Sequence, residues 1–251
     1  IALHGMHGDA PHLVLGALDH ADCVLTTEWA VRLAEALQTV SIVLTDQNLA
    51  QSRALIPQPD YTLPDIPARR TAGPNDNYQR YEITADGVSP MAIPGTACST
   101  YVADGLEHTP TGKPSTAAAD HAAQLDKRLR KIEQFEYGEL WADVRGEGET
   151  AILTWGSTTA AAREAAERLL DSGVNVKVIA IRLLMPARPE DLAEALAGVR
   201  RVLVVEQSHG LQFHRYLRSY FDIGAEIRNL ARPGPLLITP GEIVQSIEEW
   251  K

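Results

Sequence analysis

Three histidines and an aspartate lie within the first twelve residues of this 251-residue chain: His4, His7, His12 and Asp9. Imidazole and carboxylate groups are common ligands of zinc and other transition metals. The spacing of these four residues matches no metal-binding motif for which a coordination geometry can be stated. We therefore favour a structural loop here and assign no metal ligands to the chain.

Glu107 and His108 carry side-chain types that often transfer protons in enzymes. The side chains of adjacent residues point in different directions, so adjacency does not make these two residues a catalytic pair. We favour a structural hydrogen-bonding role for both. We identify no catalytic residue in the chain.

Two polar turns in the second half of the chain are candidate ligand contacts. Residues 156–159, Gly-Ser-Thr-Thr, open a predicted helix, and helix N-termini bind anions. Because the turn has no GxGxxG or Walker pattern, we favour simple capping over a nucleotide site, with Ser157 and Thr158 as the candidate anion contacts. Residues 206–210, Glu-Gln-Ser-His-Gly, end a predicted strand, where open α/β sheets place ligands. The alternative for this second turn is a contact with a neighbouring domain.

The elements that carry the histidine loop form a strand–helix–strand unit within residues 1–57. Residues 13–17 and 41–45 are apolar runs of strand length, and residues 19–37 have a broad apolar helical face. A single βαβ unit cannot bury its own sheet edges. We therefore expect further strands from chain upstream of this sequence or from a partner.

Residues 58–145 are predicted to be a connecting arm. Repeated prolines between residues 57 and 74 exclude a regular helix at the start of the arm. Two interpretations remain open: a linker packed on its own domain, or an arm that embraces a partner subunit.

A long amphipathic helix is expected within this arm, entered through residues 114–116. Ser115 or Thr116 is expected to cap its first turn, near Asp120. Residues at helical spacing predict an apolar face: Leu125, Leu129 and Ile132. The other face is basic, and we expect it to be solvated: Lys127, Arg128, Arg130 and Lys131.

Residues 146–251 alternate between apolar strand patterns and amphipathic helix patterns. The expected strands are residues 151–155, 174–183, 201–206 and 225–231, and the expected helices are residues 160–170, 189–196, 210–221 and 240–250. This alternation predicts an α/β domain with an open, mainly parallel twisted sheet.

Composition excludes several classes of protein. The formal net charge of −10 argues against a broad nucleic-acid surface, and no apolar run approaches the roughly 20 residues of a membrane span. The two cysteines, Cys23 and Cys98, are too few for a four-cysteine iron–sulfur cluster. We expect a cytoplasmic protein without a signal peptide.

Three runs resemble the α subunit of the 2-oxoacid:ferredoxin oxidoreductases, in particular the two-subunit 2-oxoglutarate type. They are HGMHGDAPHLVLGALDHADC (residues 4–23), RYEITADGVSPMAIPG (residues 80–95) and PGT…GLEHTPTGKPS…DKRLRKIE (residues 94–133). Two further runs are similar to the C-terminal domain of the transketolase family: TWGSTTAAAREAAERLLDSG (residues 154–173) and VLVVEQSHGLQFHRYLR (residues 202–218). The resemblance implies that residues 1–57 end a thiamine-diphosphate pyrimidine-binding domain and that residues 146–251 are a transketolase C-terminal-like domain.

The resemblance also implies an activity, cofactors and partners. The reaction would be oxidative decarboxylation of a 2-oxoacid with coenzyme A, or the reverse carboxylation. Thiamine diphosphate with Mg²⁺ and a [4Fe-4S] cluster would be held mainly by a β subunit, in a dimer of heterodimers that reduces ferredoxin. His7, Gly8 and Asp9 would lie close to the active-site cleft, and Ser157 and Thr158 could meet coenzyme A.

By the same resemblance, the chain is expected to be a fragment of a longer α subunit. The family's substrate-contacting residues and the glutamate that activates thiamine would lie upstream of Ile1, so the fragment alone should be inactive. Two alternatives stay open: the same family acting on pyruvate or another 2-oxoacid, and a non-catalytic scaffold subunit.

Overall fold

The computed structural model describes residues 1–59 and 63–250, which divide into two compact units. The first unit comprises residues 1–14, 28–42 and 62–136, and the second comprises residues 15–27, 43–61 and 137–251. Residues 60–62 of the predicted arm, and residue 251, lie outside the described residues.

The predicted strand–helix–strand unit is present near the N-terminus. A short 3₁₀ helix, η1 (His7–Asp9), precedes strand β1 (Leu13–Gly16), helix α1 (His20–Leu37) and strand β2 (Ser41–Leu44). Every residue of β1 is buried, as its unbroken apolar sequence predicts. A short helix that the sequence did not predict follows, α2 (Gln47–Gln51), and the Asp46 side chain caps it by accepting from the amide of Leu49.

The predicted strand over residues 174–183 is in fact two strands. Strand β7 (Lys177–Ile181) and strand β8 (Leu183–Met185) pair in different sheets, and β8 joins the order β2-β1-β8. Within the second unit, the amide of Gly16 donates to the carbonyl of Arg182 at 2.8 Å. This chain therefore provides one of the further strands expected for the first sheet, and additional strands from upstream chain or a partner stay a prediction.

The second unit contains a five-stranded sheet in the order β10-β9-β6-β7-β5. Its further strands are β5 (Ala142–Arg145), β6 (Thr150–Thr154), β9 (Arg201–Glu206) and β10 (Glu226–Ala231). The β10–β9, β9–β6 and β6–β7 pairs are parallel, and only β5, an edge strand, is antiparallel to its neighbour. The predicted open, mainly parallel sheet is confirmed.

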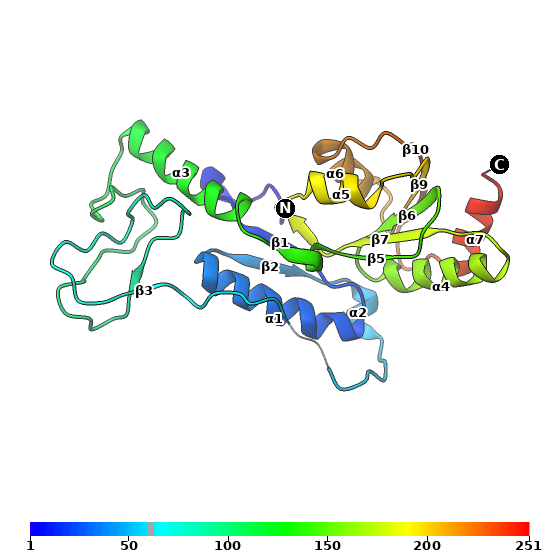
Figure 1. Cartoon of the computed structure of the whole chain (residues 1–251), viewed down its shortest axis with the longest axis horizontal. Helices are drawn as coiled ribbons and strands as arrows, with labels where there is room; N and C mark the ends of the chain where they lie inside the picture. The colour runs from blue at the N-terminus through cyan, green and yellow to red at the C-terminus, as the bar shows by residue number, and fades with distance from the viewer. Residues whose placement is uncertain (60–62, 251) are drawn as a thin grey trace. The chain divides into compact units, whose positions relative to one another are not determined.

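Helices cover both faces of this sheet (Figure 1). One face carries α4 (Thr158–Asp171) and α7 (Pro240–Glu248), and the other carries α5 (Pro189–Ala195) and α6 (Gln212–Tyr220). The first face packs a continuous apolar core that includes Ile152, Leu169, Leu203, Ile243 and Trp250. This core is what the alternating strand and helix patterns predict.

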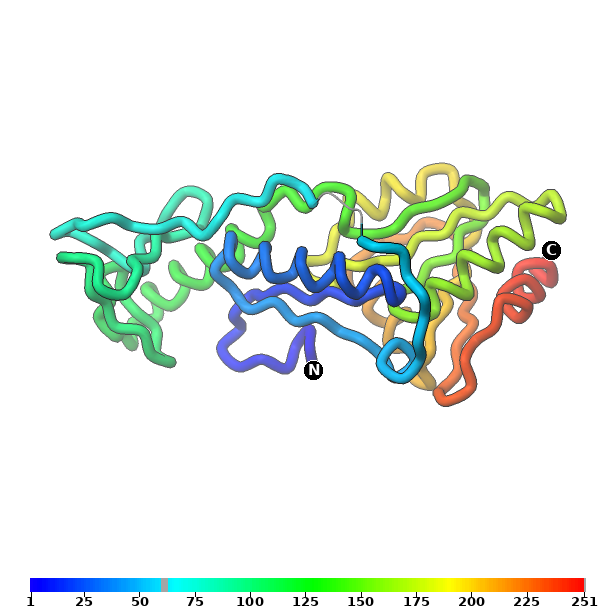
Figure 2. The backbone as a smooth tube through the Cα atoms, turned by 90° about the horizontal axis from the view of Figure 1, so that it is seen from below, coloured from blue at the N-terminus to red at the C-terminus, as the bar shows by residue number. Residues whose placement is uncertain are grey.

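The arm within the first unit is built mainly from loops. It contains two short parallel strands, β3 (Thr71–Ala72) and β4 (Met91–Ala92), and one long helix, α3 (Ala118–Glu133). No helix occurs in the described part of residues 57–97, in agreement with the prolines there. Figure 2 shows the loops as the cyan and green trace beside α3. A 3₁₀ helix, η2 (Gly138–Trp141), lies at the start of the last segment of the second unit, residues 137–251.

The predicted cap of α3 is wrong in detail. The N-cap is Ala117, which provides no side-chain hydrogen bond. The Ser115 hydroxyl instead donates to Asp120 Oδ2 at 2.5 Å and accepts from the amide of Ala117 at 3.1 Å. Ser115 thus ties the entering chain to the first turn without occupying the cap position.

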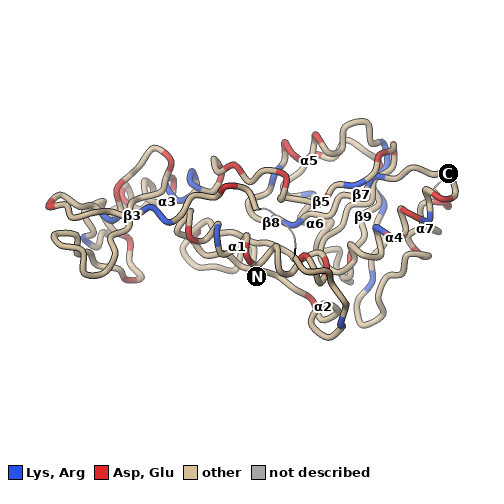
Figure 3. The backbone as a smooth tube through the Cα atoms, turned by 60° about the horizontal axis from the view of Figure 1, so that its bottom comes forward, with Lys and Arg blue, Asp and Glu red and all other residues tan. Residues whose placement is uncertain are grey.

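The predicted faces of α3 are also corrected. Leu129, expected on a buried apolar face, is 42% exposed, whereas Lys127 and Lys131, expected in solvent, are 6% and 9% exposed. Figure 3 colours every Lys and Arg position blue, including those along α3. The helix buries its lysines because their ammonium groups find oxygen acceptors on neighbouring segments, a long-range arrangement that helical periodicity does not encode.

Candidate functional site

The loop predicted to lie near an active-site cleft forms the exposed 3₁₀ helix η1. His7, Gly8 and Asp9 are all exposed. Gly8 has φ +79°, and a Cβ there would meet no atom within 4 Å. Asp9 also has a positive φ, of 51°. The loop therefore presents these three residues outward with open space above the backbone, which would let a ligand or another chain approach closely.

His12 differs from the exposed residues His7 and Asp9 because its side chain is buried. It is 6% exposed, and its ring nitrogens lie 2.6 Å from the carbonyl oxygen of Ala2 and 3.2 Å from that of Ala10. The ring holds the N-terminal loop together. In the described parts of the chain, no group of three or more His, Cys, Asp or Glu side chains is placed to hold a metal ion.

A groove of about 480 Å³ lies beside the N-terminus of α4, within the second unit. Its lining is mostly neutral and polar, and includes Gln47, Asn48, Gln51, Ser157 and Gln207. A smaller adjoining cavity of about 230 Å³ is lined by Thr158 and by apolar residues of α4. Of the two predicted anion contacts, Ser157 lines both the groove and the cavity, whereas Thr158 lines only the cavity and is itself buried.

The anion-binding groups of this helix N-terminus are already engaged within the chain. The amide of Ser157 donates to Asp46 Oδ2 at 3.1 Å, and the other oxygen of the same carboxylate caps α2. The buried Thr158 hydroxyl donates to the carbonyl of Trp155 at 2.7 Å. A carboxylate thus occupies the position where a phosphate would bind, and its negative charge would repel one.

The polar turn after β9 stabilises its own unit. Glu206 is 2% exposed, and its carboxylate accepts from the amides of Phe213 and His214, both at 2.9 Å, and from the Ser208 hydroxyl at 2.6 Å. These contacts place a buried anion at the N-terminus of α6. Gln207 binds the carbonyl of Leu236 at 2.8 Å. The turn therefore stabilises the second unit through internal hydrogen bonds. Its position at the end of a parallel strand did not predict this role.

Glu107 and His108 diverge, as their adjacency predicts. Glu107 binds Arg128 at 2.5 Å and His121 at 2.8 Å. Burial opposes ionisation of Glu107, but the hydrogen bonds from Arg128 and His121 outweigh burial and lower its pKa. The buried His108 ring stacks on Tyr81 with centroids 4.4 Å apart. These contacts give Glu107 the structural hydrogen-bonding role that the sequence favoured, whereas the buried His108 Nε2 atom has no hydrogen-bond partner within the described residues.

A buried ion pair that the sequence did not reveal lies in the second unit. Arg182, between β7 and β8, binds Asp22 in the first turn of α1 at 2.7 Å, and both are buried. Asp22 also accepts from the amide of Leu18 and the hydroxyl of Thr26, and Arg182 donates to the carbonyl of Leu140. Every strong hydrogen-bonding group of the pair is used internally, so the pair joins segments and is not open to a substrate.

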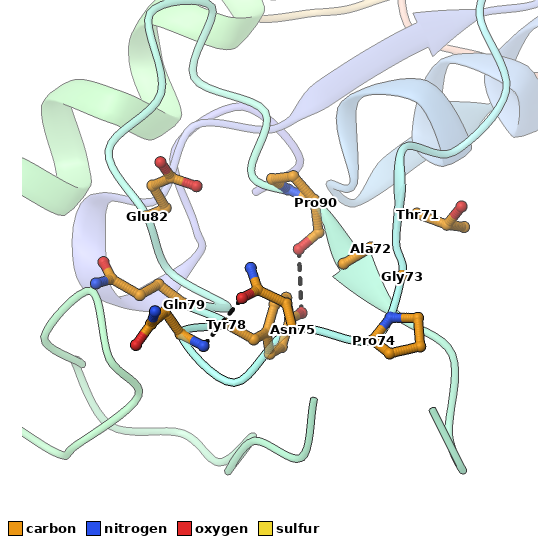
Figure 4. Close-up of a pocket in the computed structure, with 10 residues that line it drawn as sticks. Thr71, Ala72, Gly73, Pro74, Asn75, Tyr78, Gln79, Glu82 and Pro90 are labelled. Atoms are coloured by element: carbon orange, nitrogen blue, oxygen red, sulfur yellow. Dashed lines mark hydrogen bonds between the residues drawn. The ribbon is translucent and has the colours of Figure 1, made fainter. Parts of the chain in front are cut away.

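The arm of the first unit carries a polar pocket of about 510 Å³ (Figure 4). Its lining includes Asn75, Asn77, Gln79 and Glu82. The Tyr78 hydroxyl donates to the carbonyl of Pro90 at 3.1 Å and accepts from the amide of Ala92 at 2.8 Å, which fixes one wall. The pocket offers hydrogen-bonding groups but no arrangement suited to acid–base catalysis.

Comparison with known proteins identifies the proteins that this chain resembles. Residues 141–234 match the model of the transketolase C-terminal domain. The chain is 35% identical over 225 residues to subunit alpha of 2-oxoacid:ferredoxin oxidoreductase 2 from Aeropyrum pernix, an alignment that covers 86% of this chain and 35% of that relative. Over most of its length the chain is therefore similar to the α subunits of 2-oxoacid:ferredoxin oxidoreductases. The resemblance carried by residues 4–23, 80–95 and 94–133 is thereby confirmed.

Two further comparisons agree with this similarity. The 2-oxoglutarate synthase subunit KorA of Methanothermobacter marburgensis is 26% identical over 98% of this chain and 66% of its own length. A solved structure of 2-oxoglutarate:ferredoxin oxidoreductase from Magnetococcus marinus, with 2-oxoglutarate, coenzyme A and succinyl-CoA bound, aligns with a TM-score of 0.85 and 35% identity. That alignment covers 98% of this chain and 43% of the solved chain. The chain spans about a third of the length of the Aeropyrum relative.

Proposed function

We propose that this chain is part of the α subunit of a coenzyme A-dependent 2-oxoacid:ferredoxin oxidoreductase that acts on 2-oxoglutarate. The observation that supports this most is the alignment of 98% of the chain, at a TM-score of 0.85, with an oxidoreductase solved with 2-oxoglutarate and coenzyme A. A relative from Mycobacterium tuberculosis named 2-oxoglutarate oxidoreductase subunit KorA, 29% identical over 88% of this chain, supports the same substrate.

The overall reaction balances without any group from this chain being consumed. A 2-oxoacid, coenzyme A and two oxidised ferredoxins give an acyl-CoA thioester, carbon dioxide, a proton and two reduced ferredoxins. Reductive carboxylation is the same equation reversed. When bound, thiamine diphosphate provides the electron sink for loss of carbon dioxide, and an iron–sulfur cluster carries the electrons.

The metal-containing groups of this reaction do not fit the chain itself. An iron–sulfur cluster needs four thiolate ligands, whereas the chain has two cysteines, Cys23 and Cys98. They lie in different compact units, and within the described residues no cluster of acidic, His or Cys side chains suits Mg²⁺. We therefore assign thiamine diphosphate with Mg²⁺ and the [4Fe-4S] cluster mainly to a partner β subunit.

The role proposed for this chain is to support that site and to join the assembly. The exposed loop His7–Asp9 would contribute to the cleft, since its backbone is open to a ligand. Coenzyme A would reach the rim of the α4 groove, although Asp46 already fills the nearest anion position. The second unit would organise a dimer of heterodimers, with ferredoxin as electron acceptor. The described residues contain no helix long and apolar enough to cross a membrane, and we place the complex in the cytoplasm.

A turnover assay of the purified assembly that contains this chain tests the proposal. We expect coenzyme A-dependent reduction of ferredoxin with 2-oxoglutarate at a kcat/KM at least tenfold above that with pyruvate, and no turnover by residues 1–251 alone. Equal or greater activity with pyruvate would move the enzyme to another substrate. An assembly that contains the cofactors and turns over no 2-oxoacid would favour a scaffold role.

The same turnover assay tests the role of the loop His7–Asp9. An H7A/D9A double variant of the assembly is expected to raise the KM for 2-oxoglutarate more than tenfold. The control is K113A, a substitution on the arm. Unchanged kinetics in the loop variant would remove His7 and Asp9 from the cleft and leave the rest of the proposal standing.

A further inference from the structure

The turn formed by residues 81–89 lies directly on helix α3. Gly87 has φ +78°, and a Cβ there would lie 2.5 Å from the carbonyl oxygen of Lys127 and 2.9 Å from the amide nitrogen of Lys131. Contacts that short do not occur in proteins, so this approach requires glycine. The backbone of the turn is therefore seated against the backbone of the helix.

Side chains of α3 hold the carbonyl groups of this turn. Arg130 donates to the carbonyl oxygens of Ala85 and Thr84, both at 2.9 Å. Gln124 donates to the carbonyl of Tyr81, also at 2.9 Å. These hydrogen bonds satisfy carbonyl groups of a segment that forms no regular secondary structure.

Two lysines complete the contact from the buried side of α3. Lys127 Nζ lies 3.2 Å from the carbonyl oxygen of Tyr81 and 3.1 Å from the Ser89 hydroxyl. Lys131 Nζ donates to the carbonyl of Gln38, just beyond the end of α1, at 2.9 Å. The acceptors are neutral, and neither ammonium group has an ion-pair partner among the residues that the structure describes. Burial of a charge in this way favours its neutral form.

The surrounding positive charges also favour the neutral forms of Lys127 and Lys131. Arg80, which directly precedes the turn, adds positive charge around the lysines together with Arg128 and Arg130 of α3, and Glu107 is the carboxylate that opposes them. Glu107 is itself bound by Arg128 and His121. Asp86, at the tip of the turn, is paired with Arg70. His108 stacks on Tyr81 at the edge of this cluster.

We propose that residues 81–89, Lys127 and Lys131 form a pH-sensitive clasp, in which the turn docks more tightly on α3 as the two lysines lose their protons. Docking buries the amines, and undocking returns them to water, where they hold their protons more strongly. The undocked state therefore binds more protons, and lowering the pH opens the clasp. The clasp would couple the order of the arm loops to pH, independently of the catalytic role proposed above.

The pKa values agree with this geometry. Burial, reinforced by neighbouring positive charges, lowers the pKa of Lys131 to about 7 and that of Lys127 to about 8. A free lysine titrates near 10.4. Docking should therefore strengthen as pH rises from about 7 toward 10, and below about 7 the dependence on these lysines should level off.

Hydrogen exchange of the assembly tests the clasp. Protection of amides in residues 82–89 would be measured by mass spectrometry from pH 7 to pH 9 and corrected for the intrinsic exchange rate. We expect protection to rise by about tenfold or more over this range, and protection of strand β6 to stay constant.

Variants test whether Lys127 and Lys131 cause the pH dependence of amide protection. The K127M/K131M double variant keeps the apolar stems and removes the amines, so its protection should become nearly independent of pH. R130M removes a permanent charge from the same helix, so it should lower protection at every pH and keep the slope. If the double variant loses β6 protection through misfolding, K131M alone should still reduce the slope by more than half. A flat wild-type profile, or a slope that survives in the lysine variants, would overturn the proposal.

Discussion

Arg182 and Asp22 are 160 positions apart, yet they form a bidentate ion pair that is almost completely buried. Neither residue stands out in the sequence, because an arginine after one apolar strand and an aspartate in a first helical turn are both common. Their pairing follows only from the split between β7 and β8, which places Arg182 between two sheets. Single residues of this kind join distant segments and lie beyond what local pattern can predict.

Loss of Arg182 should be among the most damaging single changes in the second unit. R182M would leave the Asp22 carboxylate buried without a counter-charge, which costs about 3–5 kcal/mol of unfolding free energy. Urea denaturation followed by circular dichroism measures the loss. The D22N/R182M double variant removes both charges and should recover most of it. Equal losses in the two variants would contradict an electrostatic origin.

Gly16 in β1 is a second residue whose identity is fixed by a close contact. A Cβ at this position would lie 2.7 Å from the ring of Trp155, within the second unit. G16A should therefore destabilise the protein by about 1–3 kcal/mol through overpacking. G241A is the matched control, since a Cβ there meets nothing within 4 Å. A thermal melt in which G16A and G241A behave alike would refute the contact.

Hydrophobic periodicity predicts the bounds of a helix or strand well where that element faces a large apolar core. Strand β9 has the predicted bounds, residues 201–206, and helices α1 and α5 differ from prediction by one residue. Hydrophobic periodicity does not predict the buried face of helix α3. Its partner is a loop rather than an apolar sheet, so its buried face contains Gln124, Lys127 and Lys131, whose aliphatic stems and polar ends fit a surface of carbonyl groups. From the sequence, the two lysines were expected in solvent.

Helix α6 depends on a carboxylate that belongs to the preceding strand. Glu206 accepts from two amides in the first turn of α6, and Leu211 at the N-cap provides no side-chain bond. E206A should leave those buried amides unsatisfied and cost about 1–3 kcal/mol. Amide exchange should then accelerate in residues 212–216 before it does in α4. E206Q, which retains one acceptor oxygen, should show a smaller effect; a larger effect in E206Q than in E206A would argue against capping.

At the scale of the whole molecule, the sequence predicted the mainly parallel sheet, the transketolase C-terminal-like domain and the oxidoreductase family, all of which are confirmed. The predicted contact residues His7–Asp9, Ser157 and Thr158 remain proposals. Local sequence identified exposed or helix-opening residues correctly. It could not show that Asp46, 111 positions earlier, already occupies the anion position at Ser157.

We propose that this chain is one piece of a multi-subunit oxidoreductase. Native and denaturing mass spectra of the assembly purified through this chain test that claim most directly. We predict this sequence within a longer α polypeptide or with a companion fragment, bound to a second subunit that carries iron and thiamine diphosphate. A single 27.3 kDa species with no companion chain would contradict the account.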